Sequence, residues 1–370
     1  MEDVDEFGPE KIVEVYDPLV GMRGVLVIDN TVLGPGKGGI RMTPTVDTHE
    51  VKKLARAMTW KCSLHGLPFG GAKSGITADP KAMSPEKKRQ IMGSFARAVH
   101  ELAPCEYIAA PDMNTGEEEM RTFAEINGPK SVTGKPADMG GIPHELGTTA
   151  WGVFHATKVA AKHVGITLEG ATVAIEGFGN VGAFAAKFLS EAGAKVVAVS
   201  DSRGMAYLAK GLDYNTLTMI KKETGMVTKY PGAKAMPNDA MQALDVDILI
   251  PAAVPDFITV RDITRIRAKL IVEGSNIPTT ANIERILWKR GITVVPDFVA
   301  NAGGVIGSWA EWAGKGSKVA FKEIEALEAK NTKRVLEMAA KENITPREAA
   351  MDIARTRILT AHKKFPANRL

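Results

Sequence analysis

The stretch ATVAIEGFGNVG, residues 171–182, decides the fold of the second half of the chain. An apolar, β-branched run leads into a GxGxxG turn, and a segment rich in Ala, Phe and Leu follows it. A strand that passes through such a turn into a helix is typical of a dinucleotide-binding unit. We predict that this turn, at the start of its helix, contacts the pyrophosphate of a dinucleotide through Gly177, Phe178, Gly179, Asn180, Val181 and Gly182.

The same alternation of strand and helix continues on the C-terminal side of this turn. Short apolar runs that we expect to be strands recur at residues 195–200, 247–251, 269–273 and 292–296. Buried strands that alternate with helices favour a parallel sheet covered on both faces. The sequence therefore predicts an α/β fold with a Rossmann-type dinucleotide-binding domain.

Asp201 ends the second of these strands, and it lies 201 − 182 = 19 residues beyond the last glycine of the turn. A carboxylate at this separation is expected to bind the ribose hydroxyls of NAD and to repel the 2′-phosphate of NADP. Arg203, two residues later, could accept that phosphate instead. We expect NAD or NADP as the cofactor, with a slight preference for NAD.

The first half of the chain has a different pattern. Residues 11–17 and 23–29 predict a pair of strands, and residues 49–65 have the apolar spacing of a helix. A second helix is expected to begin at Ser84, with Pro85 in its first turn. The stretch LPFGGAKSG, residues 67–75, is interpreted as a glycine-rich loop that brings Lys73 and main-chain amides to a small substrate.

Composition limits the possible functions. The 370 residues are enough for two domains, and a hydrophobic content of 45% with a charged content of 24% is ordinary for a soluble protein. The net charge is +4, and the basic residues are scattered along the chain and interleaved with acidic ones, so we expect no nucleic-acid partner. The sequence contains no run of about 18 apolar residues, so we expect no membrane span. Two cysteines and no secretory leader favour the reducing cytoplasm, and no spaced ligand cluster predicts a metal.

Four motifs together resemble the glutamate dehydrogenase family, whose superfamily includes leucine, valine and phenylalanine dehydrogenases. They are GKGGIR (36–41), MTWKCSLHGLPFGGAKSGI (58–76), APDMNT (110–115) and VANAGGVIGSWAEW (299–312). The resemblance implies an N-terminal α/β substrate-binding and oligomerisation domain over residues 1–147, joined by C-terminal helices at about 330–370. It also implies a dinucleotide-binding domain over residues 148–329 and assembly into a homohexamer.

The resemblance assigns a role to each part of an oxidative deamination. Lys73 matches the catalytic lysine, which deprotonates water, and Asp112 matches the aspartate that exchanges protons with the substrate amino group. Lys61 matches the lysine for the substrate α-carboxylate. Asn276 and Asn301 match residues near the nicotinamide end of the cofactor.

Two further positions bear on which amino acid reacts. Lys37 and Ser308 match the residues that hold the γ-carboxylate in glutamate enzymes, where the leucine and phenylalanine enzymes are apolar. A dicarboxylate would pair the charge of Lys37, whereas a leucine side chain would leave that charge unpaired. Ala110 and Thr149 match pocket-lining positions, although Thr149 could equally cap a helix. We therefore expect L-glutamate, 2-oxoglutarate and ammonium as the substrates.

Two alternatives remain open at this stage. A leucine- or phenylalanine-type dehydrogenase would share most of these residues, and a non-catalytic regulatory subunit could keep the fold. The chain also departs from the family at Ser74, where glycine is expected, and in GGIPHELGT (140–148), where His144 lies and an arginine-containing version is expected.

Overall fold

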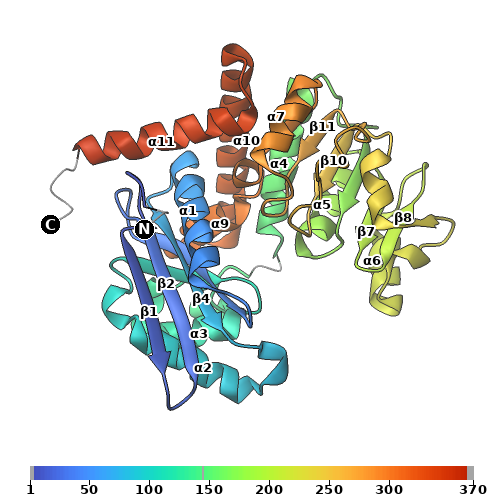
Figure 1. Ribbon diagram of the computed structural model, residues 1–370. Helices are drawn as coiled ribbons and strands as arrows, with labels where there is room; N and C mark the ends of the chain where they lie inside the picture. The colour runs from blue at the N-terminus through green and yellow to red at the C-terminus, as the bar shows by residue number, and fades with distance from the viewer. Residues whose placement is uncertain (1–3, 144–145, 365–370) are drawn as a thin grey trace. The chain divides into compact units, whose positions relative to one another are not determined.

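The computed structural model describes residues 4–143 and 146–364, which form two compact units (Figure 1). The first unit comprises Met1–Leu146, Val305–Ala320 and Met351–Leu370, and the second comprises Gly147–Gly304 and Phe321–Ala350. This division differs from the expected one in the last quarter of the chain. Residues 305–320 group with the first unit and residues 321–350 with the second, whereas we expected 148–329 to form the second domain and the helices from about 330 onward to join the first.

A mixed five-stranded sheet forms the centre of the first unit, in the order β1-β2-β4-β3-β5. Its strands are β1 (Lys11–Asp17), β2 (Met22–Asn30), β3 (Gly36–Thr43), β4 (Gly70–Thr77) and β5 (Tyr107–Pro111). The predicted pair β1 and β2 is antiparallel, as is β2 with β4, whereas β3 runs parallel to both β4 and β5. The parallel strands end at one edge, so residues that follow β3 and β5 lie near one another.

Three helices cover this sheet: α1 (Thr48–Leu64), α2 (Pro85–Ala98) and α3 (Glu117–Asn127). The N-cap of α2 is Ser84, whose hydroxyl accepts a hydrogen bond from Lys87 N at 3.1 Å. One apolar cluster joins the sheet to α2 and α3, and a smaller one, which includes Val27 and Val51, joins it to α1. The sheet is therefore covered on both faces, and its side chains are largely buried except in the edge strand β1.

The stretch around Lys73 is a strand, which corrects our interpretation of it as a loop. Residues 70–77 form β4, a central and almost wholly buried strand. Its glycines serve close packing: a Cβ on Gly71 would lie 2.1 Å from Thr59 Oγ1, and one on Gly75 would lie 2.7 Å from Val46 Cγ2. The sequence misled because glycine marks both turns and close backbone contacts.

The second unit contains a seven-stranded sheet in the order β12-β11-β10-β6-β7-β8-β9. Its strands are β6 (Thr172–Glu176), β7 (Lys195–Asp201), β8 (Gly204–Tyr207), β9 (Lys234–Met236), β10 (Ile248–Pro251), β11 (Leu270–Val272) and β12 (Thr293–Val295). The five predicted strands run parallel, and β8 and β9 add an antiparallel edge that we did not anticipate. The predicted α/β, Rossmann-type fold is confirmed.

Helices connect these strands and complete the chain. They are α4 (Thr148–His163), α5 (Asn180–Glu191), α6 (Tyr214–Thr224), α7 (Ala281–Lys289), α8 (Asp297–Ala300), α9 (Gly303–Trp312), α10 (Ser317–Glu342) and α11 (Pro346–Lys364). Within the second unit, Trp151 of α4 stacks edge-on against Phe188 of α5 and donates to Phe321 O at 3.0 Å. Among the described helices, none is both long and apolar enough to cross a membrane.

Candidate active site

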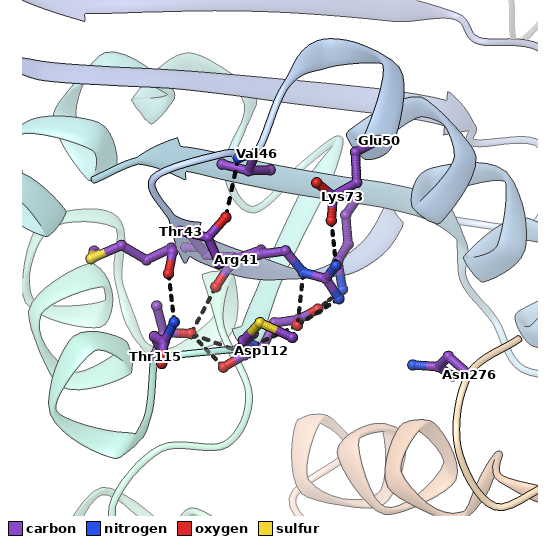
Figure 2. A network of polar contacts seen from close by, with 12 residues as sticks. Arg41, Thr43, Val46, Glu50, Lys73, Asp112, Thr115 and Asn276 are labelled. Carbon is purple, nitrogen blue, oxygen red and sulfur yellow. Dashed lines mark hydrogen bonds and ion pairs between the residues drawn. The ribbon is translucent and has the colours of Figure 1, made fainter. Parts of the chain in front are cut away.

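Lys73 and Asp112 meet at the end of the parallel strands in the first unit. Lys73 lies on β4 with 7% of its surface exposed, and its Nζ forms an ion pair with Oδ2 of Asp112, which directly follows β5 (Figure 2). Gly39 of β3 makes room for this pair, because a Cβ there would lie 2.8 Å from the Asp112 Cβ. The two predicted catalytic residues are therefore in direct contact.

Arg41 of β3 holds the other side of Asp112, as Figure 2 shows. Its Nη2 lies 3.2 Å from Asp112 Oδ1, and its Nη1 pairs with Glu50 of α1. Thr115 fixes the main chain by accepting a hydrogen bond from Asp112 N at 2.9 Å. The sequence analysis quoted Arg41 within GKGGIR without assigning it a role. The register between β3 and β5 identifies it: Ile40 pairs with Pro111, so Arg41 lies next to Asp112.

Lys73 has an unusual electrostatic environment. Burial, followed by the positive charges of Arg41, Lys61 and Lys37, lowers its pKa well below that of an ordinary lysine. Contact with Asp112 opposes this effect, because a carboxylate favours the ammonium form. The pair is thus arranged to keep one proton and to exchange it, which is the property required of a group that acts as both acid and base.

Lys37 is a second buried cation in the same unit. Only 1% of its surface is exposed, and its Nζ donates to Ala109 O at 3.0 Å. Burial is the main reason why its pKa falls to about 7, and Lys135 contributes in the same direction. Within residues 4–143 and 146–364, no carboxylate lies at ion-pair distance from this amine. A bound anion would compensate the cost of burying it.

The remaining predicted substrate residues divide between the two units. Lys61 lies half-buried in the last turn of α1, Ala110 pairs with Gly39 in the β3–β5 register, and Ser308 lies half-buried on α9 in the first unit. Thr149 belongs to the second unit, in the first turn of α4. It is not the helix cap, because Gly147 occupies that position. His144 lies outside the described residues.

Ser74, the departure from the expected glycine, has a defined partner. Its hydroxyl donates to the Tyr107 hydroxyl at 2.9 Å, and Tyr107 in turn donates to Gly38 O at 3.1 Å. Both side chains are fully buried. The serine is therefore accommodated by a hydroxyl chain that joins β4, β5 and β3 beside Lys73, and the ion pair of Lys73 with Asp112 is kept.

The glycines of the GxGxxG turn have the geometry that each position requires. Gly177 has a φ of +91°, and a Cβ on Gly182 would lie 1.9 Å from Gly177 O, so α5 packs directly on the turn. Gly179 is the N-cap of α5, and a Cβ there would meet no atom within 4 Å. Phe178 is buried, whereas Asn180 is exposed and Val181 half-buried at the start of the helix. The turn thus leaves an accessible backbone at Gly179, where a phosphate could approach.

Asp201, which we expected to bind ribose hydroxyls, already has three hydrogen-bond donors within the protein. Its Oδ2 accepts hydrogen bonds from Lys221 Nζ at 2.7 Å and from Val227 N at 2.8 Å, and its Oδ1 accepts one from Arg203 N at 2.7 Å. Burial opposes ionisation, but these donors together lower its pKa below the ordinary value. The exposed side chains at this strand end are those of Ser202 and Arg203.

Asn276 and Asn301 lie together within the second unit. Asn301 Nδ2 donates to Asn276 Oδ1 at 3.1 Å and to Ser275 O at 3.2 Å. Asn301 is buried and Asn276 is exposed. The buried asparagine therefore orients the exposed one, whose amide is available to a ligand.

Among the buried carboxylates for which no role was expected, Glu176 and Glu311 each fix a loop. Glu176 ends β6 and accepts hydrogen bonds from Ala252 N at 3.0 Å and from Ala253 N at 2.8 Å, so it fixes the loop after β10 beside the GxGxxG turn. Glu311 of α9 pairs with Lys135 at 2.8 Å and orders the glycine-rich segment after residue 133. Both lie within motifs quoted above, at 171–182 and 299–312, but no role was expected for either, because each acts on a backbone that is distant in sequence.

The described residues contain no group of three or more His, Cys, Asp or Glu side chains that could hold a metal ion. The titratable side chains gathered around Lys73 in the first unit are amines, a guanidinium and carboxylates.

Comparison with known proteins gives a consistent result. Residues 140–365 match the family model described as Glutamate/Leucine/Phenylalanine/Valine dehydrogenase, and residues 9–126 match the model of its dimerisation domain. The chain is 42% identical over 353 residues to a glutamate dehydrogenase of Aeropyrum pernix, which covers 90% of this chain and 84% of that one. It is 40% identical over 333 residues to an NADP-specific glutamate dehydrogenase of Saccharolobus shibatae, with coverages of 86% and 79%.

Solved structures agree with the sequence comparison. The hetero-hexameric glutamate dehydrogenase of Thermus thermophilus, in its leucine-bound form, superposes with a TM-score of 0.88 at 27% identity. The superposition covers 96% of this chain and 90% of that one. The similarity therefore extends over both units.

Proposed function

Because this chain belongs to the family of glutamate, leucine, phenylalanine and valine dehydrogenases, we propose that it catalyses the reversible oxidative deamination of L-glutamate. The chain is an NAD(P)-dependent oxidoreductase that acts on the amino group of an amino acid. L-Glutamate, water and oxidised cofactor give 2-oxoglutarate, ammonium, reduced cofactor and a proton. The family includes other substrates, so glutamate requires an argument from this chain.

The burial of the Lys37 amine is the observation that favours glutamate as the substrate. Its amine is fully buried, donates to one carbonyl and acts electrostatically on Lys73. A γ-carboxylate bound to Lys37 would supply the missing counter-ion, whereas the side chain of leucine or phenylalanine would leave a polar group unpaired. Ser308 would add a hydroxyl to the same carboxylate, and Ala110 would leave space for the substrate chain.

The remaining residues of the first unit have complementary roles. Lys61 would bind the α-carboxylate, so that the two ends of the substrate are held by two different amines. Asp112 would exchange protons with the substrate amino group. Lys73 would take a proton from the attacking water and stabilise the oxygen of the intermediate, which its lowered pKa supports. Thr149 would contribute a hydroxyl from the second unit.

The cofactor supplies the acceptor for the hydride, and residues of the second unit would bind and orient it. Gly177, Gly179 and Gly182 would receive the pyrophosphate at the start of α5. Asn276 and Asn301 would bind the nicotinamide end. The residues around Asp201 fit either cofactor, because that carboxylate is already bonded to Lys221 and the exposed Arg203 is available to a 2′-phosphate. We therefore propose that both NAD and NADP are used.

We also propose a homohexamer in a reducing cytoplasm. The hexamer is supported by the hetero-hexameric relative from Thermus thermophilus and by the match to a dimerisation domain. The location is supported by the two free cysteines, Cys62, which is buried, and Cys105, which is exposed. Light scattering on the purified protein would measure the assembly directly.

The decisive experiment follows reduction of each cofactor by absorbance with glutamate, leucine and phenylalanine as substrates. The wild-type enzyme is compared with Lys37→Met and with the matched control Lys81→Met, which removes an exposed lysine. We expect wild type and control to prefer glutamate by at least tenfold. We expect Lys37→Met to lose most of its kcat/KM for glutamate while its activity with leucine is kept or gained, because an apolar side chain replaces the buried amine.

Two results would contradict the proposal. A preference of the wild type for leucine or phenylalanine by more than tenfold would favour the alternative dehydrogenase. An absence of cofactor reduction with all three amino acids would favour a regulatory subunit that does not catalyse the reaction.

A further inference from the structure

The residue after Asn276 has a backbone conformation that its side chain disfavours. Ile277 has a φ of +51°, in the left-handed region that β-branched residues avoid. Its side chain is 46% exposed, so packing does not explain the conformation. Such outliers persist where surrounding contacts impose them, and they gather at functional sites.

Asp297 is the contact that holds Ile277. The Asp297 Oδ2 accepts a hydrogen bond from Ile277 N at 3.0 Å, and Ile277 O accepts one from Asp256 N at 3.0 Å. The main chain on both sides of the Ile277 α-carbon is thus fixed. Since Asn276 directly precedes this point, its direction depends on the same two hydrogen bonds.

Arg347 in turn holds Asp297. The Arg347 Nη2 lies 3.1 Å from Asp297 Oδ1, and the same guanidinium reaches the buried carboxylates of Glu273 and Glu284. Asp297 N donates to Glu273 Oε2 at 2.8 Å, which closes the network. All of these residues belong to the second unit. The guanidinium of Arg347 therefore pairs with three carboxylates. One of these, Asp297, binds the main chain of the segment that carries Asn276.

Retaining this network is costly for the fold. Burial and neighbouring carboxylates raise the pKa of Glu273 well above its usual range, and burial also raises the pKa of Glu284. Within the described chain, Glu273 Oε1 and Glu284 Oε2 are buried without a hydrogen-bond partner. A network kept only for stability would be replaced well by apolar side chains. Asp297 links this network to the strained backbone at Ile277.

We propose that Arg347 is a positioning residue for the nicotinamide end of the cofactor. It acts through Asp297, which keeps Ile277 in the left-handed conformation and so points Asn276 toward the cofactor. This inference rests on the proposed function, because it takes Asn276 as a cofactor-binding residue. It predicts that the strain at Ile277, and not the charge of Arg347 as such, links the network to cofactor affinity.

The test measures the Kd of NADH and NADPH by fluorescence for the wild type and four variants. Arg347→Met removes the network, and Arg285→Met removes a nearby arginine that pairs with Glu348 on the surface. Ile277→Gly introduces a residue that adopts positive φ without cost, and the fourth variant combines it with Arg347→Met. The KM values for cofactor and for glutamate are measured alongside.

We expect Arg347→Met to weaken cofactor binding about tenfold, equivalent to about 1.4 kcal/mol, and to leave the KM for glutamate unchanged. Arg285→Met should bind as the wild type does. The double variant should recover most of the lost affinity, because glycine no longer needs the network to reach the left-handed region. A purely structural role for Arg347 would not be rescued in this way.

The proposal is overturned if Arg347→Met binds cofactor as tightly as the wild type, or if the double variant binds as weakly as Arg347→Met. Should Arg347→Met fail to fold, Asp297→Asn tests the same link with its shape preserved, and Ile277→Gly should again restore affinity. Failure of the proposed function is distinguishable, because a wild type that binds NADPH but does not oxidise glutamate leaves this inference standing.

Discussion

The two units solve the problem of binding with different means. In the first unit, the predicted site is made of side chains, and the buried Lys73 interacts through charge with the buried Lys37 and the half-buried Asp112. In the second unit, the turn after β6 depends on backbone, because Gly177 needs a positive φ and Gly182 needs the absence of a Cβ. The difference shows that the first site should respond to changes of charge and the second to changes of volume.

The largest expected effect comes from removing one charge in the first unit. Asp112→Asn keeps the shape of the side chain but cannot carry a proton, so we expect kcat to fall by about 10²- to 10⁴-fold. Steady-state assays with glutamate measure this effect. Asp138→Asn, which removes an exposed carboxylate paired with Arg121, serves as the control and should keep full activity. Comparable rates for the two variants would contradict a proton-transfer role for Asp112.

An added methyl group should have different effects at two glycines of the second unit. Gly182→Ala places a Cβ against Gly177 O, so we expect the free energy of unfolding to fall by about 1–3 kcal/mol or more. Gly179→Ala meets no atom and should change stability by less than about 0.5 kcal/mol. It should nevertheless weaken cofactor binding, because the methyl group would project into the space where we expect the phosphate. Denaturant unfolding and NADPH fluorescence measure the two effects, and equal destabilisation of both variants would contradict the comparison.

The burial of Lys37 should be detectable as proton uptake when 2-oxoglutarate binds. Its pKa of about 7 in the free protein means that the amine is mostly neutral at pH 8. A bound dicarboxylate favours the charged form and raises this pKa, so binding of 2-oxoglutarate at pH 8 should take up about one proton. At pH 6 the amine is already charged and this uptake should disappear.

Calorimetry in two buffers of different ionisation enthalpy measures the proton uptake, and Lys37→Met should show less of it at pH 8. Equal uptake by Lys37→Met and the wild type would assign the proton to another group, and our account of the γ-carboxylate would then need revision.

The smallest expected effect concerns cofactor choice. Lys221→Met frees Asp201 from its ion pair, so the carboxylate can bind ribose hydroxyls and repel a 2′-phosphate. We expect a shift of about threefold to tenfold in kcat/KM toward NAD, since the exposed Arg203 remains. A shift toward NADP, or no shift, would mean that Asp201 does not face the adenosine ribose.

Sequence alone predicted those parts of the molecule that depend on local pattern. The parallel strands, the Ser84 cap and the GxGxxG turn all follow from spacing within a few residues. Reasoning failed where a contact joins distant segments. Glycines that pack β4 against α1 were interpreted as a loop, and the pairing of Asp201 with Lys221 was hidden because it depends on how α6 packs.

The residues of the site also divide into those that were predicted from the sequence and those that were not. The resemblance supplied Lys73 and Asp112, and the structure brings them into contact. Arg41 and Arg347 were missed because their roles depend on strand register and on a buried network. Charged networks assembled across strands have no sequence period, so only the folded structure discloses them.

Our central proposal is that Lys73 performs the proton chemistry of glutamate deamination, whereas cofactor binding depends on residues of the second unit. The most direct measurement is the turnover of Lys73→Ala with glutamate, combined with its Kd for NADPH and compared with Lys81→Ala. We predict that kcat falls at least about 10³-fold while the Kd stays within twofold of the wild type. Turnover that persists in Lys73→Ala with unchanged NADPH binding would contradict the account.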